Sequence, residues 1–253
     1  MKKINLLIFL LLLTPFISAQ VSSISLEKYC PNDEGQKGAI CFAYATTYSA
    51  LSIEHNVKNN KVKGSDEFKT FSYGFVASKV KKNKSFWGRM FNRCGRNATA
   101  KLALDVLKEN GTVIYKQFPE KCKCKKTDRL LDEAGEFKIQ SYEVVGNTEV
   151  DDAVHIESIK SRLKNKKPVI TTIYQVGFFR SANEQEDILF PDGYQKKPNN
   201  ANHVVCIVGF DDNRNGGSFL VKNNYKAWGK DGFAYVKYED YLKLVRTSYV
   251  INL

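Results

Sequence analysis

A long stretch without Gly or Pro, residues 39–63, carries apolar or aromatic side chains on nearly all faces of a helix. The large or apolar members of its first half are Phe42, Tyr44, Ala45, Tyr48, Ala50, Leu51 and Ile53. A helix that is apolar all round is a buried helix. The pattern therefore predicts a buried central helix that begins at Cys41 and ends within residues 56–60. A polar loop over 61–67 follows, and a second helix is expected to begin at Phe75.

The clearest amphipathic helix is predicted over residues 99–109. Leu102, Ala103, Val106 and Leu107 share one face, and Asn110-Gly111 supplies the stop. Residues 112–119 read as a short extended segment that Pro119 ends. A strand over 137–145, a helix over 155–167 and a strand over 168–176 come next.

The last third of the chain alternates strands and turns. A strand from His203 to Phe210 is followed by a turn over 211–217 and by closing strands over 218–224 and 232–241. Residues 177–200 form an irregular connection with two glycines and two prolines, and long loops of this kind often shape binding sites. Helices first and strands last predict an α+β fold with two lobes. We expect a helical lobe over about 30–120 and a β lobe over about 121–253.

The first 19 residues predict a secretory signal peptide. Two lysines precede an apolar run from Ile4 to Leu13, and small residues stand near Ala19. This apolar run is shorter than a helix that spans a bilayer, which needs about 20 residues. A retained membrane anchor is the alternative interpretation. We expect cleavage after Ala19, a secreted or periplasmic location without stable membrane insertion, and one domain over 20–253. No other segment is long and apolar enough to span a membrane.

The chain is basic, with a formal net charge of +12 among 253 residues. Removing Lys2 and Lys3 lowers this charge to +10. Lysine-rich stretches at 79–84, 121–126 and 160–167 are scattered and indicate a solvated basic surface, or attraction to anionic surfaces or acidic protein substrates. No motif supports nucleic-acid binding. With three scattered histidines and no second cysteine pair at zinc spacing, no metal and no cofactor are expected.

Six cysteines divide into three groups. Cys41 lies at the start of the predicted central helix, and Cys206 lies inside an apolar strand and is expected to be buried and reduced. The other four are Cys30, Cys94, Cys122 and Cys124. In an oxidising compartment they could form two disulfides in three possible pairings.

Three residues in chain order suggest nucleophilic catalysis. The first turn of a helix favours a thiolate at Cys41. His203 opens an apolar strand, and Asn223 follows the next strand. Cys, His and Asn that lie far apart in sequence are typical of a thiol nucleophile, its base and the residue that orients the base.

The loop and helix around Cys41, the strand from His203 and the KNxxxxWGxxGF run from Lys222 to Phe233 together resemble the papain-like cysteine peptidase family, in the family's order. The resemblance covers most of the chain after the signal peptide. It implies a helical lobe around the central helix that carries Cys41, an antiparallel, barrel-like β lobe, a peptide or protein substrate and a monomer. Only about twenty residues separate the signal peptide from Cys41. We therefore expect a bacterial-type, exported peptidase without a large propeptide.

The resemblance also implies roles for single residues. Cys41 is the nucleophile, His203 the base and Asn223 the residue that orients it, while Gln36 and the Cys41 N–H stabilise the oxyanion. Cys94-Gly95 resembles a family stretch whose backbone lines the substrate cleft, which makes Gly95 a substrate-binding candidate. Tyr225, the other substrate-binding candidate, stands where the family often has Trp and shields the His–Asn bond.

The chain departs from the family pattern in three places. The residue after Cys41 is Phe42, where the family often has Trp. Gln36 stands five residues before Cys41, where the family usually places its glutamine six before. The segment after Asn223 reads Asn-Tyr-Lys instead of Ser-Trp-Gly, which makes Asn224 the alternative orienting residue.

Two other functions fit these residues. One is a catalytically inactive relative that binds peptide or protein in the same cleft. The other is a Cys–His enzyme of another class, such as a cell-wall amidase or a transglutaminase-like protein. His55 and His155 are the alternative bases, but His55 lies about 20 Å along the helix from Cys41 at 1.5 Å per residue.

Overall fold

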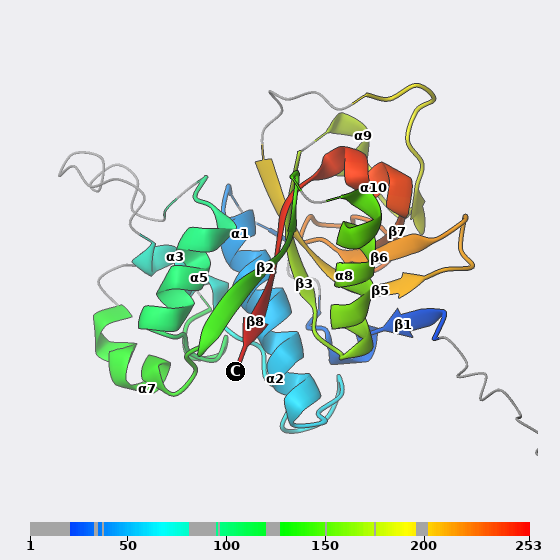
Figure 1. Cartoon of the computed structure of the whole chain (residues 1–253). Coiled ribbons are helices and arrows are strands. Elements are labelled where there is room, and N and C mark those ends of the chain that lie inside the picture. The colour runs from blue at the N-terminus through cyan, green and yellow to red at the C-terminus, as the bar shows by residue number, and fades with distance from the viewer. Residues whose placement is uncertain are drawn as a thin grey trace, which may run out of the picture.

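The computed structural model describes most of the chain after residue 20 (Figure 1). The described residues are 21–32, 35–36, 38–80, 95, 97–119, 127–149, 151–174, 176–195 and 202–253. Helices gather on one side of the molecule and a sheet on the other, with the central helix beside the sheet. The predicted signal peptide lies outside the described residues. Within the described part, no helix combines the length and the apolar character needed to cross a membrane.

The central helix begins at Cys41, as predicted, and continues to Lys58. It has three consecutive segments, α1 (Cys41–Ala43), a π-helical segment η2 (Tyr44–Leu51) and α2 (Ser52–Lys58). Every side chain from residue 42 to residue 54 is buried, which confirms the interpretation of the all-round apolar pattern. Polar members of this run bond within the helix, since the Thr46 hydroxyl donates to the Phe42 carbonyl at 2.7 Å. Such hydroxyl bonds and π-helical turns are common where a helix departs from regular geometry.

The other helices of this side pack around the central helix. They are α3 (Tyr73–Lys79), α5 (Ala100–Glu109), η3 (Asp128–Leu130) and α7 (Leu131–Gly135). Each of the first two has an N-cap hydroxyl, with Ser72 accepting from the Phe75 N–H and Thr99 from the Leu102 N–H. Ala134 of α7 shares a small core with Phe75, so the helical packing continues beyond residue 120.

The sheet has the strand order β2-β8-β3-β5-β6-β7-β4, with β1 paired to β5. Its strands are β1 (Ser23–Ser25), β2 (Ser141–Asn147), β3 (Val169–Tyr174), β4 (Asp187–Ile188), β5 (Asn202–Asp211), β6 (Ser218–Lys222), β7 (Phe233–Lys237) and β8 (Val245–Asn252). The helices of this side are η1 (Glu27–Tyr29), α8 (Asp152–Lys164), α9 (Gly177–Arg180) and α10 (Tyr238–Leu244). All described pairings are antiparallel except that of β4 with β7. The predicted α+β fold is confirmed.

Three predicted elements differ in the structure. Residues 112–119 form turns, with a single bridge from Ile114 to Phe71, instead of a continuous extended segment. The predicted last strand ends at Lys237, and α10 begins at Tyr238 with Glu239 and Asp240 in its first turn, where acidic side chains stabilise the helix dipole. The final strand β8 was not predicted, although it lies between β2 and β3.

Cys30 and Cys206 are both buried free thiols. The Cys30 thiol donates to the Leu26 carbonyl at 3.4 Å. The expectation that Cys30 forms a disulfide is therefore wrong for this structure, while the reduced, buried state of Cys206 is confirmed. Cys94, Cys122 and Cys124 lie outside the described residues.

Candidate active site

Cys41 is the first residue of the central helix and faces the start of β5. Segment α1 packs against β5, and the backbone N–H of Val204, the residue after His203, lies next to the Cys41 sulfur. Burial raises the pKa of the Cys41 thiol, and the backbone N–H groups of Val204, Phe42 and Cys41 itself oppose this rise. The fold thus brings a half-buried thiol to the strand that carries the predicted base.

His203 and Asn223 meet because their strands are neighbours. Residue 203 lies at the start of β5 and residue 223 follows the end of β6. Because these two strands pair antiparallel, both residues lie at the same end of this strand pair. His203 Nε2 lies 2.8 Å from Asn223 Oδ1, and both side chains are buried. The hydrogen bond thus joins the two residues that the sequence paired.

A second donor fixes the orientation of the Asn223 amide. The Asn224 backbone N–H donates to the same Oδ1 at 2.8 Å, so this atom must be an oxygen that accepts. His203 therefore carries its proton on Nε2 when it is neutral, which leaves Nδ1 able to accept a proton. Burial lowers the pKa of His203 to about 4, the Asn223 bond opposes this shift, and the Arg180 charge adds to it. At neutral pH the imidazole is uncharged.

Tyr225 covers one face of the imidazole. Its ring stacks on the His203 ring with centroids 4.6 Å apart and planes inclined by 16°. The hydroxyl lies 3.2 Å from Nδ1. In the Nε2–H tautomer Nδ1 carries no proton, so the Tyr225 hydroxyl donates this hydrogen bond to it. Among the described residues no hydrogen bond joins His203 to the Cys41 sulfur.

Gln36 ties the loop before Cys41 to the segment after Asn223. Its backbone N–H donates to the Asn224 carbonyl, and its side-chain Nε2 donates to the Gly38 carbonyl at 2.7 Å. The amide nitrogen has a second proton that this bond does not use. The loop position suits a donor beside Cys41, but the contact of this proton with an oxyanion stays a prediction.

Gly95 lies in a stretch that runs beside the same loop. The Asn97 N–H donates to the Ala39 carbonyl at 2.9 Å, two residues before Cys41. Gly95 has a φ of +55°, and a Cβ at this position would lie 2.7 Å from Val80 Cγ1. Glycine is thus needed here for both conformation and space, and the contact of Gly95 with substrate stays a prediction.

The alternative residues point elsewhere. Asn224 Oδ1 accepts from the Ser49 hydroxyl of the central helix at 3.5 Å, so the structure places Asn223, not Asn224, against His203. His155 is buried, with Nε2 3.2 Å from the Ser248 hydroxyl in the sheet. His55 lies at the far end of the central helix.

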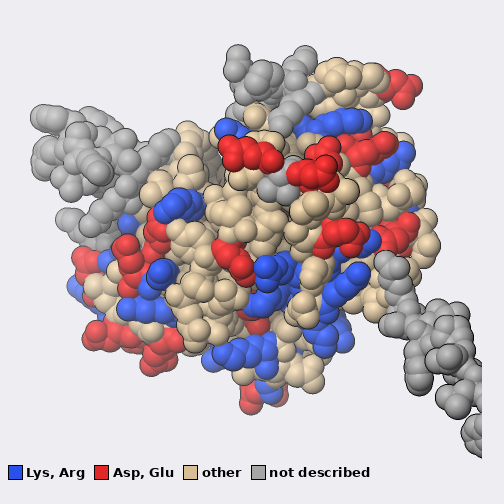
Figure 2. Space-filling model, in the orientation of Figure 1, with Lys and Arg blue, Asp and Glu red and all other residues tan. Residues whose placement is uncertain are grey.

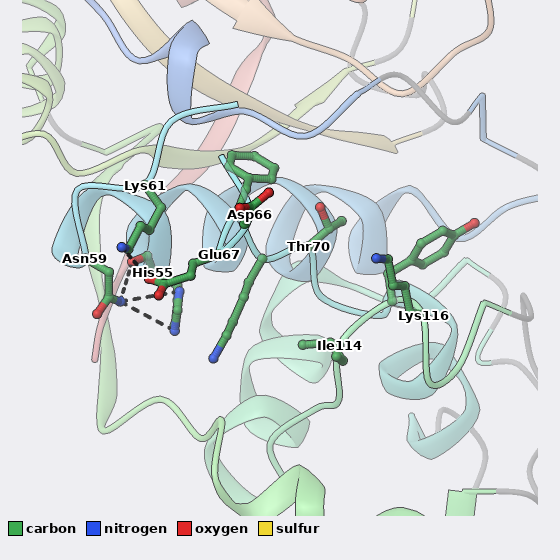
Figure 3. Close-up of a pocket in the computed structure, with 11 residues that line it drawn as sticks. His55, Asn59, Lys61, Asp66, Glu67, Thr70, Ile114 and Lys116 are labelled. Carbon is green, nitrogen blue, oxygen red and sulfur yellow. Dashed lines mark hydrogen bonds and ion pairs between the residues drawn. The ribbon is translucent and has the colours of Figure 1, made fainter. Parts of the chain in front are cut away.

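A separate cavity of about 500 Å³ surrounds His55 (Figure 3). Its wall includes Lys61 and the loop that continues to Thr70. Lys61 forms an ion pair with Glu67, which also lines the cavity. The His55 ring packs edge-on against Phe71 at 5.3 Å, and burial lowers its pKa. Cys41, His203 and Asn223 are absent from its described lining, so this cavity is separate from the candidate active site.

The family model described as "Papain family cysteine protease" matches residues 41–250. No curated protein sequence matches the chain.

Solved structures give the same fold. Digestive procathepsin L 3 of the Tenebrio molitor larval midgut is 14% identical, with a TM-score of 0.67 over 93% of this chain and 72% of that one. The proform of the ragweed pollen allergen Amb a 11 is 18% identical, with a TM-score of 0.67 over 94% and 67%. Xylellain, a cysteine protease from Xylella fastidiosa, is 17% identical, with a TM-score of 0.66 over 91% and 85%. At such identities the likeness shows the fold alone.

Proposed function

The chain belongs to the papain family of cysteine proteases, and we propose that this cysteine-type peptidase cleaves peptide bonds through a Cys41–His203–Asn223 mechanism. The observation that carries the proposal is the hydrogen bond from His203 Nε2 to Asn223 Oδ1, with the Cys41 sulfur beside the Val204 N–H. This bond leaves Nδ1 as the proton acceptor at the strand end that Cys41 faces.

The acyl-transfer steps follow from these positions. His203 Nδ1 takes the thiol proton while the Cys41 sulfur forms a bond to the substrate carbonyl carbon. The oxyanion that develops accepts hydrogen bonds from the Cys41 N–H and the Gln36 amide. His203 then donates its proton to the leaving amine as the C–N bond breaks, and a thioester remains on Cys41.

Deacylation repeats the sequence with water. His203 Nδ1 takes a proton from a water molecule, whose oxygen attacks the thioester carbon. The C–S bond breaks, the sulfur recovers the proton, and the acid product leaves. Asn223 holds the ring in the Nε2–H tautomer throughout, and the Tyr225 ring keeps water from one face of the imidazole.

Hydrolysis of casein and of a mixed peptide library tests this function. Protein that begins at Gln20 is assayed under reducing conditions at pH 5 to 8, beside Cys41→Ala. We expect the wild type to cleave and the variant to lose at least about 10³-fold in rate, as enzymes do when a nucleophile is removed. An inactive wild type whose Cys41 also resists alkylation would contradict the catalytic assignment.

The second candidate is an inactive relative that binds peptide in the same cleft. It is favoured by the bond of Gln36 Nε2 to Gly38 and by the absence, among the described residues, of a direct bond from His203 to Cys41. The rate of Cys41 alkylation discriminates the two, because an activated thiol reacts much faster than Cys30 or Cys206.

We also propose that residues 1–19 direct export and are removed after Ala19. The support is the basic start, the apolar run and the small residues before the cleavage point. N-terminal sequencing of the protein from the periplasm or medium of an expressing bacterium tests this, and an intact Met1 or a cytoplasmic protein would contradict it.

A further inference from the structure

The nitrogen that must accept the Cys41 proton already has a hydrogen-bond partner. In the Nε2–H tautomer of His203, Nδ1 carries only a lone pair, and the Tyr225 hydroxyl donates to it across 3.2 Å. The ring nitrogen of a neutral imidazole has one lone pair and accepts one hydrogen bond. The Cys41 thiol and the Tyr225 hydroxyl therefore compete for the same acceptor.

In this structure the hydroxyl, and not the thiol, holds that acceptor. Among the described residues no hydrogen bond joins the Cys41 sulfur to His203, although the sulfur lies next to the N–H of the following residue, Val204. Burial raises the pKa of the Cys41 thiol and lowers the pKa of His203 to about 4. The proton thus stays on sulfur, and the site holds a neutral thiol beside a neutral imidazole.

Two contacts keep the Tyr225 ring in this place. The ring stacks on His203 with centroids 4.6 Å apart, and the Arg180 guanidinium at the end of α9 lies over it, 6.0 Å from its centroid. A cation over an aromatic ring is attracted to it. Tyr225 is nevertheless only half-buried, whereas His203 and Asn223 are buried. Of these three side chains, Tyr225 can therefore move with the smallest loss of packing.

The covering of the imidazole does not need the hydroxyl. An aromatic ring stacks on its neighbour and keeps water from that face whether or not it carries a polar group. The hydroxyl of Tyr225 is a separate feature, a donor that points at the nitrogen on which the reaction depends. Its effect can be measured without removing the ring.

We propose that Tyr225 is a positioning residue that restrains the peptidase, because its hydroxyl holds Nδ1 of His203 until the ring moves aside. The proposal rests on the peptidase function above and adds a restraint on the same site. When the hydroxyl leaves, the thiol proton passes to Nδ1, which gives a thiolate beside an imidazolium with no change in total charge. The reactive fraction is the population of this open arrangement, which one ordinary hydrogen bond lowers about two- to tenfold.

Tyr225→Phe tests the proposal because it keeps the ring and removes only the hydroxyl. Mass spectrometry follows alkylation of Cys41 by iodoacetamide from pH 5 to 9. This uncharged reagent is chosen because the chain is basic, with lysines and arginines interspersed among acidic residues on the face shown in Figure 2. We expect the variant to react about two- to tenfold faster near pH 7, with a pH profile that extends to lower pH, since more of the thiol gives its proton to His203.

Tyr238→Phe is the matched control. Its hydroxyl donates to Asp212 at 2.7 Å, and Asp212 follows the end of β5 opposite to His203, so alkylation of Cys41 should not change. Unchanged or slower alkylation in Tyr225→Phe, with a native circular dichroism spectrum, would overturn the proposal, and a slower rate would indicate a hydroxyl that relays the proton. If Tyr225→Phe fails to fold, Tyr225→Trp decides in its place, because it also keeps an aromatic face without the hydroxyl.

A measurement that needs no catalysis separates this proposal from the peptidase function. The nitrogen NMR signal of His203 Nδ1 in Cys41→Ala reports the hydrogen bond from Tyr225, and His203→Gln assigns this signal among the three histidines. We expect the signal to shift when Tyr225→Phe is added, even if the wild type does not hydrolyse peptides. An unchanged signal would overturn the proposed restraint even if the wild type is an active peptidase.

Discussion

At the scale of single residues, one oxygen atom organises the candidate site. Asn223 Oδ1 accepts from both His203 and the Asn224 backbone, which sets the imidazole tautomer without any charged partner. The sequence motif predicted Asn223 and His203 because both stand next to apolar strands in a recognisable run. It could not predict the charge of Arg180 near them, since this proximity depends on how α9 packs against the segment after β6.

Asn223→Ala is expected to lower kcat/KM about 10- to 100-fold. It removes a buried hydrogen bond worth about 1–3 kcal/mol and releases the imidazole tautomer. Steady-state kinetics with a single peptide measure the change. Asn224→Ala is the control, because the Asn224 side chain contacts Ser49, and a loss as large as that of Asn223→Ala would contradict the orienting role.

Acid should inactivate the enzyme through His203. Below about pH 4 the imidazole becomes charged and can no longer take the Cys41 proton. The folded-state pKa lies below the ordinary value of 6.5, so the unfolded chain binds this proton first, and stability falls as pH drops from 6.5 towards 4. Each unit in this window costs up to about 1.4 kcal/mol.

Urea unfolding at pH 7, 5.5 and 4.5 measures the effect on stability. His203→Gln removes the titrating group, and its midpoint should fall less over the same range. An equal fall in both proteins would show that other groups govern the acid sensitivity.

At the scale of elements, several boundaries follow from local chemistry and others from distant contacts. Helix α5 begins at its Thr99 cap and ends before Asn110-Gly111, as its sequence pattern predicts. The alternation of apolar and polar side chains alone did not predict strand β8 or helix α10, because it did not separate this short acidic helix from the strands on either side of it. The approach of α7 to the end of α5 is likewise a tertiary contact, and Gly111 lies at it.

Gly111→Ala should destabilise the protein by about 2–4 kcal/mol. Gly111 has a φ of +74°, and an added Cβ would lie 1.9 Å from the Ala134 carbonyl oxygen of α7, so backbone must move. Gly64→Ala is the control, with a φ of +92° but no atom within 4 Å of the new Cβ, and should cost only about 1 kcal/mol. Urea unfolding followed by circular dichroism measures the free energy of unfolding of both variants. Equal losses of stability in the two variants would contradict the steric argument.

At the scale of the whole molecule, the central helix is joined to the end of the sheet by one lysine. Lys167 Nζ lies 2.7 Å from Glu54 Oε1 of α2, and it also donates to the Ile251 carbonyl at 3.2 Å and to Asn252 Oδ1 at 3.1 Å. Burial raises the pKa of Glu54, and the Lys167 contact opposes this rise. The ammonium therefore offsets the cost of enclosing a carboxylate between helix and sheet.

Lys167→Met should lower the free energy of unfolding by about 1–3 kcal/mol. The loss is smaller than that for a fully buried pair because the lysine is partly exposed. Lys101→Met is the matched control, since Lys101 pairs with Asp105 on the exposed face of α5 and should lose at most about 0.5 kcal/mol. Thermal unfolding of both variants measures the difference, and similar losses would contradict the role of the enclosed pair.

The central place of β5 has a consequence for a protease that can meet its own chain. Cleavage requires a segment to leave the fold and extend through another molecule's cleft, which exposed loops do far more readily than paired strands. Strand β5 is paired on both sides by β3 and β6, whereas residues 59–64 after the central helix are almost all exposed. Autolysis would therefore nick such loops long before it reached the strand that carries His203, and nicked molecules would keep this proposed base in place.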